Sequence, residues 1–301
     1  MKISNWIEAF RLRTLPLALS NTIIGSCLAA ADDKFRWSIF GLAALTTVLL
    51  QIMSNMANDY GDFVNGKDTA ERIGPKRMVQ SGEITPKTML RGIIVLGILC
   101  AVSGVSLIII GTEGIPVTSM LLFGLLGLAA IAAAIKYTVG KNPYGYRGLG
   151  DIFVFIFFGL VGVIGTYFQH TQTIRWDIVF PASAIGLLST GVLNMNNMRD
   201  YKADKNAGKK TIVVTMGVKN ARFYQLFLIG GAVLLTVIYT LLNYHSAWQW
   251  LFVLSFPVMY LNLKKVFTYK DALELYPELP RVSIASLIFA LTFGIGLLIY
   301  F

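Results

Sequence analysis

The chain has 301 residues, of which 55% are hydrophobic and 14% are charged, and its mean hydropathy is +0.64. Soluble globular proteins carry roughly 25% charged residues because water must wet their surface, so this composition excludes a soluble domain. The formal net charge of +10 is compatible with nucleic-acid binding. Basic residues gathered at the cytoplasmic ends of membrane-spanning helices give the same net charge. We adopt this second interpretation and expect no nucleic-acid partner.

Apolar segments, each close to the about 20 residues that cross a bilayer core, follow one another along the chain. Backbone polar groups must be satisfied within each segment in lipid, so we predict helices rather than strands. The residues before Thr14 alternate aromatic and basic side chains, which predicts a short interfacial helix. The nine predicted spans are 14–31, 38–58, 90–111, 115–136, 151–169, 178–197, 223–242, 248–266 and 282–301.

The basic residues are distributed very unequally between the two sides of this arrangement. With a cytoplasmic N-terminus, only Lys34, Arg36 and Arg175 fall outside, and the other 23 of the 26 Lys and Arg residues fall inside. Short loops rich in Lys and Arg stay in the cytoplasm. The sequence therefore predicts a cytoplasmic N-terminus, an odd number of spans and an external C-terminus.

Two long polar loops lie on the predicted inner side, at about 59–89 and 198–222. Functional residues concentrate on loops held by a rigid scaffold. Each loop follows a span that would end with an amide and two carboxylates on one face, if the helix continues. These residues are Asn55, Asp59 and Asp62 at the first loop, and Asn197, Asp200 and Asp204 at the second.

This matched spacing predicts an internal repeat, with halves at roughly 14–137 and 151–266, whose motifs face each other across one site. Clustered carboxylates at the edge of an apolar bundle repel one another unless a cation lies among them. Mg²⁺ binds oxygen ligands and bridges to phosphates, and Arg and Lys side chains bind phosphate oxygens. With an apolar volume beneath, the pattern predicts a lipid diphosphate as substrate.

Several stretches of the chain resemble the UbiA superfamily of intramembrane aromatic prenyltransferases. The stretches are Arg13–Pro16, Asn55–Asp68, Arg72–Pro75, Tyr137–Gly140, Pro143–Asp151, Asn196–Asp204 and Gly208–Gly217. The first motif of that superfamily is usually N-D-x-x-D-x-x-x-D. Here Asp59 and Asp62 fit, Gly66 occupies the third acidic position, and Asp68 is the next acid. This spacing is similar to that of the branch that prenylates 1,4-dihydroxy-2-naphthoate.

The resemblance implies an all-α membrane protein with nine helices around a central cavity and a cytoplasmic cap. It implies Mg²⁺-dependent transfer of a polyprenyl group from polyprenyl diphosphate to 1,4-dihydroxy-2-naphthoate. Loss of CO₂ and diphosphate would give a demethylmenaquinol in menaquinone biosynthesis. The expected location is the cytoplasmic membrane of a bacterium, with the active site on the cytoplasmic side.

Roles for individual residues follow from this resemblance together with the chemistry of the side chains. The expected Mg²⁺ ligands are Asp59, Asp62, Asp200 and Asp204, with Asp68 as a further candidate. The expected diphosphate contacts are Asn58, Arg77, Lys141, Arg147, Asn196, Asn197, Arg199 and Lys209. Aromatic faces stabilise an allylic cation, for which the candidates are Tyr60, Tyr137 and Tyr144, although each could instead belong to an interfacial belt. Asp151 could orient or deprotonate the aromatic acceptor, or cap a helix.

Two alternatives remain open at the level of the sequence. Another member of the same superfamily would use a different aromatic acceptor, such as 4-hydroxybenzoate. A polytopic transporter could also be built from repeats, although its charged residues usually lie at the membrane midplane. Here the acids lie at the predicted rim, which favours an enzyme.

Overall fold

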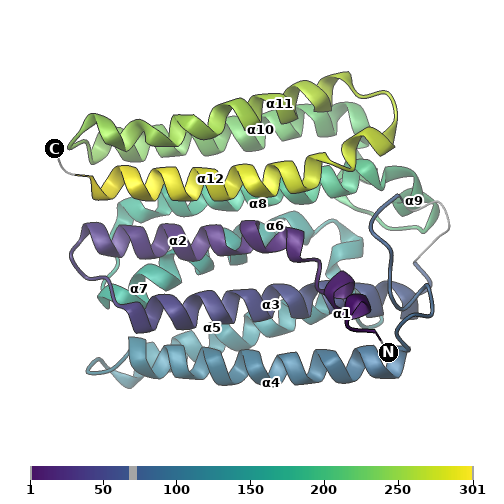
Figure 1. Ribbon diagram of the computed structural model, residues 1–301, viewed down its shortest axis with the longest axis horizontal. Coiled ribbons are helices and arrows are strands. Elements are labelled where there is room, and N and C mark those ends of the chain that lie inside the picture. The colour runs from purple at the N-terminus through teal and green to yellow at the C-terminus, as the bar shows by residue number, and fades with distance from the viewer. Residues whose placement is uncertain (1, 68–72, 300–301) are drawn as a thin grey trace.

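All regular structure in residues 2–67 and 73–299, the part of the chain that the computed structural model describes, is helical (Figure 1). Within these residues, nine helical segments are long and apolar enough to cross a membrane. The predicted all-α membrane class and the nine spans are therefore confirmed. Asp68 lies outside the described residues.

The helices follow the apolar segments, with shorter 3-10 and π segments between or within them. In chain order the elements are α1 (Ile3–Phe10), η1 (Leu12–Thr14), α2 (Leu15–Ala31), α3 (Trp37–Val64), α4 (Pro86–Gly111), α5 (Val117–Lys136), η2 (Tyr144–Arg147), α6 (Gly150–Val154), η3 (Phe155–Ile164), α7 (Gly165–Thr171), η4 (Trp176–Ile178), α8 (Val179–Arg199), α9 (Tyr201–Asn206), α10 (Ile212–Leu242), η5 (Ala247–Ser255), α11 (Phe256–Thr268), η6 (Ala272–Leu275) and α12 (Glu278–Leu298).

The largest difference from the predicted spans concerns the seventh. α10 begins at Ile212, well before residue 223, because the Thr211 side chain accepts a hydrogen bond from the Val214 amide and caps the helix. The backbone at Gly217 then departs from helical geometry, with φ 78° and ψ 156°, and kinks α10. The segment between the cap and residue 223 is thus helical rather than part of a polar loop.

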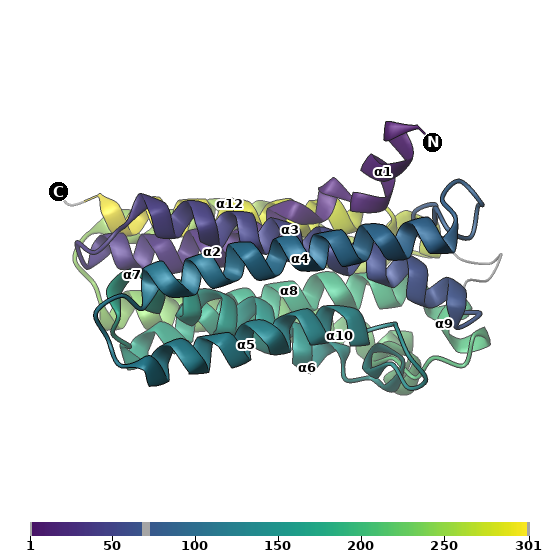
Figure 2. The ribbon, with the colours of Figure 1, turned by 90° about the horizontal axis from the view of Figure 1, so that it is seen from below.

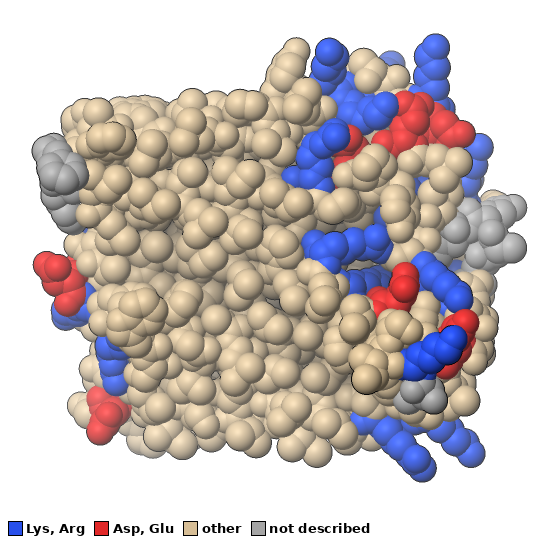
Figure 3. Space-filling view, viewed as in Figure 1, with Lys and Arg blue, Asp and Glu red and all other residues tan. Residues whose placement is uncertain are grey.

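The spanning helices run side by side, and the polar elements gather at one end of the bundle. α1, α9 and the connection between α3 and α4 lie at that end (Figures 1 and 2). Most Lys, Arg, Asp and Glu side chains on the visible face also lie there, while the surface along the bundle is apolar (Figure 3). We refer to this end as the cap.

The span from α6 to α7 contains a π-helical stretch, η3, of 10 residues. π-Helical turns are rare and often occur at functional sites. Two glycines bring η3 against α8, since a Cβ atom on Gly159 would lie 2.7 Å from the Gly186 Cα atom. Small residues allow such close helix contacts in membranes. This packing fixes the position of η3, which forms one wall of the central cavity described below.

Candidate active site

The first aspartate motif lies entirely on α3, which continues to Val64 before the chain turns. Asn55, Asp59 and Asp62 therefore share one face of a single helix, as their spacing predicts. All three side chains are buried. The helix approaches the turn after α5 closely at Gly61, where a Cβ atom would lie 2.7 Å from the Thr138 carbonyl.

Asp59 connects α3 to the chain segment that leads into α4. Its Oδ2 atom accepts a hydrogen bond from the Met78 amide at 2.8 Å, and its Oδ1 atom accepts one from the Val79 amide at 3.2 Å. Backbone donors inside a protein need such partners. The carboxylate therefore positions this segment against α3, and this bonding brings Arg77 next to Asp62.

Asp62 is bonded to three side chains at the cap. It forms an ion pair with Arg77 and accepts hydrogen bonds from Lys209 Nζ at 3.1 Å and from the Tyr146 hydroxyl at 2.6 Å. A buried carboxylate requires this degree of compensation because it has lost its hydration. Burial, followed by the charge of Asp62, raises the pKa of Tyr146, so its hydroxyl remains protonated and donates to the carboxylate.

The second motif is not one continuous helical stripe, in contrast to the prediction from its spacing. α8 ends at Arg199, Asp200 lies at the junction, and α9 begins at Tyr201. Arg199 donates to Asp200 through Nε at 2.9 Å and Nη2 at 2.6 Å, and to Asn196 Oδ1 at 2.5 Å. This bidentate pair between sequence neighbours accompanies the break between the two helices.

Lys209 joins the two motifs. Its Nζ atom lies 3.1 Å from Asp62 Oδ1 on α3 and 3.5 Å from Asp204 Oδ1 on α9. Burial, followed by repulsion from Asp200 and Asp62, raises the pKa of Asp204 to about 6 even with Lys209 beside it. Asp62, Asp200 and Asp204 thus form one buried acid cluster, and Arg77, Arg199 and Lys209 are its cationic partners.

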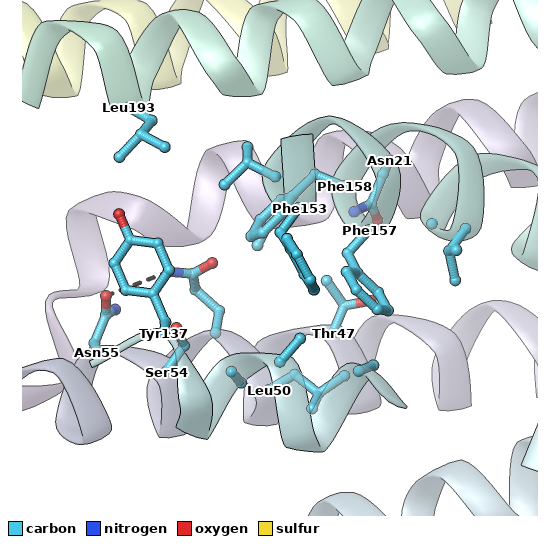
Figure 4. Close-up of a pocket in the computed structure, with 18 of the residues that line it drawn as sticks. Asn21, Thr47, Leu50, Ser54, Asn55, Tyr137, Phe153, Phe157, Phe158 and Leu193 are labelled. Atoms are coloured by element: carbon cyan, nitrogen blue, oxygen red, sulfur yellow. Dashed lines mark hydrogen bonds between the residues drawn. The ribbon is translucent and has the colours of Figure 1, made fainter. Parts of the chain in front are cut away.

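A cavity of about 300 Å³ lies next to this cluster, within the membrane-spanning part of the bundle (Figure 4). Asn58 and Asn196, one from each motif, line it. An aromatic wall from α6 and η3 faces polar side chains from α2 and α3. The lining includes Asn21, Thr47, Leu50, Gln51, Ser54, Asn55, Asn58, Tyr137, Tyr144, Phe153, Phe157, Phe158, Leu193 and Asn196.

Two of the three predicted tyrosines line the cavity. The rings of Tyr137 and Tyr144 meet edge-on at 5.4 Å, and Tyr144 stacks on Phe153 at 4.1 Å. The Tyr144 hydroxyl donates to the Ala133 carbonyl at 2.8 Å. Tyr144 therefore contributes its aromatic ring, rather than its hydroxyl, to the cavity. Burial raises the pKa of both phenols. Tyr60 instead packs against the apolar cluster of Met53, Met56 and Met89.

The structure does not bring every predicted site residue to the cavity or to the acid cluster. Lys141 and Arg147 are exposed to solvent. Asn197 is buried on α8 and is not among the residues that line the cavity. Asp151 is buried on α6 close to Tyr224, and it also does not line the cavity.

Several residues that the fold places at the site could hardly be predicted from the sequence. Tyr146 lies in the Pro143–Asp151 stretch, but nothing in its spacing marks it as a partner of Asp62. Phe157 and Phe158 look like ordinary packing residues of an apolar span. Asn21 is the residue of this group that could have been noticed in the sequence, because a buried amide in the middle of a membrane span is energetically costly and therefore unusual.

The donor chemistry of the cap fits a hard divalent cation. Its acids are oxygen donors, the ligand type that Mg²⁺ prefers, and burial, its largest cause, raises the pKa of Asp204. In the described residues, no three acidic, His or Cys side chains already converge as a metal site. Basic side chains, with Lys209 between Asp62 and Asp204, lie among the carboxylates instead.

Fold and site together define a helical integral membrane protein that can hold a polyanion beside an apolar cavity. Residues 18–275 match the model of the UbiA prenyltransferase family, and the chain belongs to this family.

Named relatives and a solved structure agree with this membership. A 1,4-dihydroxy-2-naphthoate octaprenyltransferase of Haemophilus influenzae is 43% identical over 99% of this chain and 97% of its own length. The protein of the same name in Escherichia coli is 41% identical over 97% of this chain and 94% of its own length. A UbiA homologue from Archaeoglobus fulgidus, solved with GPP and Mg²⁺, has a TM-score of 0.62 at 14% identity. It covers 97% of this chain and 99% of its own, and this likeness shows the shared fold.

Proposed function

We propose that the protein transfers a polyprenyl group from polyprenyl diphosphate to 1,4-dihydroxy-2-naphthoate, releasing CO₂ and diphosphate and forming a demethylmenaquinol for menaquinone biosynthesis. The observation that carries this proposal is the 41–43% identity to enzymes named for that reaction over nearly their whole length. The meeting of both aspartate motifs beside one aromatic cavity supports it.

The acid cluster is the proposed binding site for Mg²⁺ and the diphosphate. Asp62, Asp200 and Asp204 are the residues we assign to the metal, with Asp59 positioning the neighbouring segment and adding negative charge. When bound, Mg²⁺ would neutralise charge that develops on the leaving diphosphate. Arg77, Arg199 and Lys209 already lie among these carboxylates and would turn to phosphate oxygens. Asn58 and Asn196 border the cavity, where they would hold the oxygens nearest the allylic carbon.

The cavity is the proposed place of prenyl transfer. Cleavage of the allylic C–O bond sends its electron pair to diphosphate and leaves a cation that water would quench. The faces of Tyr137, Tyr144 and Phe153 line this space, exclude water and stabilise positive charge.

The transfer step needs no proton acceptor for the ring carbon. The ring carbon that bears the carboxylate forms the new C–C bond, and the C–CO₂ bond then breaks. The electron pair of that bond returns to the ring and restores aromaticity as CO₂ leaves. A buried Asp151 that does not line the cavity is consistent with this chemistry, since no base has to reach the acceptor.

The test is an assay of the purified protein in detergent with Mg²⁺, a polyprenyl diphosphate and either 1,4-dihydroxy-2-naphthoate or 4-hydroxybenzoate. Mass spectrometry should find a decarboxylated prenyl-naphthoquinol that is absent when EDTA is added. If product forms only from 4-hydroxybenzoate, the protein is a prenyltransferase of this family with that acceptor, and the naphthoate assignment is wrong. Intact diphosphate with both acceptors would contradict an enzymatic function and favour the transporter.

A further inference from the structure

The cavity has two chemically different walls. Phe153, Phe157 and Phe158 form one, since Phe157 and Phe158 follow Phe153 by four and five residues, about one helical turn, on α6 and η3. The other is a polar stripe on α3, where Thr47, Gln51, Ser54 and Asn58 follow at helical spacing toward Asp62; Asn21 on α2 lies across from Gly162 of η3. Figure 4 shows Asn21 with Phe157 and Phe158 toward one end of the cavity, and Ser54 and Tyr137 toward the other.

Some members of the polar stripe are satisfied by the protein itself. The Thr47 hydroxyl is hydrogen-bonded to that of Thr22 at 3.1 Å. Gln51 donates through Nε2 to Thr14 and Asn55, although its buried Oε1 atom has no partner among the described residues. Asn55 donates to the Phe10 carbonyl at 2.9 Å. These contacts connect α3 to α2 and to the end of α1, so they have a structural explanation.

Asn21 and Ser54 lack this explanation. Asn21 is 5% exposed, and its Oδ1 atom accepts from the Thr22 hydroxyl at 3.1 Å. Among the described residues, neither the Asn21 Nδ2 group nor the Ser54 hydroxyl has a hydrogen-bond partner, and both residues line the cavity. An unpartnered polar group at membrane depth is unfavourable, which indicates that a polar ligand satisfies it.

We infer that Asn21 and Ser54 bind the ring oxygens of the aromatic acceptor, whose flat face packs against Phe157 and Phe158. A hydrocarbon tail offers no hydrogen-bond acceptor, so these two groups distinguish the acceptor from the prenyl chain. The cavity volume of about 300 Å³ is at the lower end for small-molecule sites and suits a bicyclic aromatic. This inference rests on the proposed function, because it assigns the acceptor side of that reaction.

The glycine opposite Asn21 provides independent support. A Cβ atom on Gly162 would lie 2.7 Å from Asn21 Nδ2 and 2.8 Å from its Cγ. Any larger residue would displace the amide from its present position. Gly162 thus allows η3 to approach α2 while leaving the Asn21 amide in the cavity wall.

The experiment compares Asn21→Ala, Ser54→Ala and Gly162→Ala with wild type, and uses Ser20→Ala as the matched control. Ser20 is also buried on α2, but its hydroxyl donates to the Pro16 carbonyl at 2.8 Å and does not line the cavity. We expect each cavity variant to raise the KM for 1,4-dihydroxy-2-naphthoate about tenfold, the effect of losing one buried hydrogen bond. The KM for polyprenyl diphosphate should not change, and Ser20→Ala should match wild type in both.

A second measurement separates recognition from a general loss of structure. Calorimetric titration with 1,4-dihydroxy-2-naphthoate and with 2-naphthoate, which lacks both hydroxyls, gives the preference for ring oxygens. Wild type should prefer the dihydroxy compound, and Asn21→Ala and Ser54→Ala should lose much of this preference, since sites that bind a hydroxyl reject analogues without it. An unchanged preference in both variants, or a KM change confined to the prenyl diphosphate, would overturn the inference.

The two proposals fail in different ways. If wild type binds 1,4-dihydroxy-2-naphthoate with the expected preference but forms no product, the proposed function is wrong and the acceptor site stands. If product forms but the variants keep wild-type KM and preference, the reaction stands and the assignment of Asn21 and Ser54 is wrong.

Discussion

At the scale of single residues, the cap is organised by the contacts of Lys209. This side chain is 12% exposed and lies between acids from two motifs that are distant in sequence. A lysine in this position balances part of the charge of the cluster, and in the proposed reaction it would transfer its contact to phosphate oxygens. The contact links the two motifs, and neither motif predicts this link alone.

Replacing Lys209 by Gln should lower kcat/KM by at least about 100-fold, as loss of one preorganised contact to a developing negative charge does. Lys205→Gln is the matched control, because Lys205 is on the neighbouring helix α9 and is exposed. Steady-state kinetics with purified, folded variants gives the comparison. Equal activity of both variants would contradict the role of Lys209.

The raised pKa of Asp204, about 6 against an ordinary 3.8, predicts how stability depends on pH. The folded protein binds this proton more tightly than the unfolded chain, so the stabilisation is complete below 3.8 and is lost as pH rises through about 6. The effect is on the order of 3 kcal/mol at most. The contribution of Asp204 should therefore lower the melting temperature at about pH 7 relative to about pH 5. This is measured by thermal unfolding in detergent without Mg²⁺.

Asp204→Asn isolates this contribution, because it removes the titrating group and should flatten the pH dependence. Adding Mg²⁺ to wild type should restore stability mainly at the higher pH, where the carboxylate is ionised. A pH dependence that is identical in wild type and Asp204→Asn would show that Asp204 does not titrate in this range.

At the scale of helices, local breaks in regular geometry position the site. α8 and α9 are separated at Asp200, η3 is π-helical, and α10 kinks at Gly217. Each break lies where a spanning element meets the cap or the cavity. A regular helix in these places would present a different set of side chains.

The kink at Gly217 gives a direct test with a matched control in the same helix. Its φ of 78° and ψ of 156° belong to a region that residues with a Cβ rarely adopt. Gly217→Ala should destabilise the protein by about 1–3 kcal/mol. Gly230→Ala, where a Cβ would meet nothing within 4 Å and the backbone is helical, should be neutral or slightly stabilising. Melting temperatures measure both, and equal values would exclude backbone strain at Gly217.

At the scale of the whole molecule, the polar cap and the opposite end are clearly distinguished (Figure 3). The opposite end is fixed by Arg175, which bonds to Asp32 at 2.6 Å, to Asp177 at 2.6 Å and to Asn243 at 2.9 Å. These contacts join the connections after α2, α7 and α10. The far end of the bundle is thereby held together away from the cap.

The concentration of Lys and Arg predicts that the cap is cytoplasmic and the opposite end external. A cysteine placed at Lys205 should react with a membrane-impermeant maleimide only after cells are permeabilised. A cysteine placed at Trp176, which is 71% exposed at the opposite end, should react in intact cells. The reverse pattern would invert the topology and place the site on the other side of the membrane.

The membrane class, the nine spans, the paired Asn/Asp motifs and the family could all be predicted from the amino-acid sequence, because hydropathy, charge and spacing are local properties. The repeat of two halves remains a prediction from that same spacing. The folded chain was needed to show that Lys209 bridges Asp62 and Asp204, that Tyr146 donates to Asp62, and that Asp151 does not line the cavity. The structure also showed that Asn21, Phe157 and Phe158 line the cavity, which distinguishes them from other residues of the apolar spans. Which face of a membrane helix meets a cavity depends on helix packing, and packing involves residues that the chain order keeps far apart.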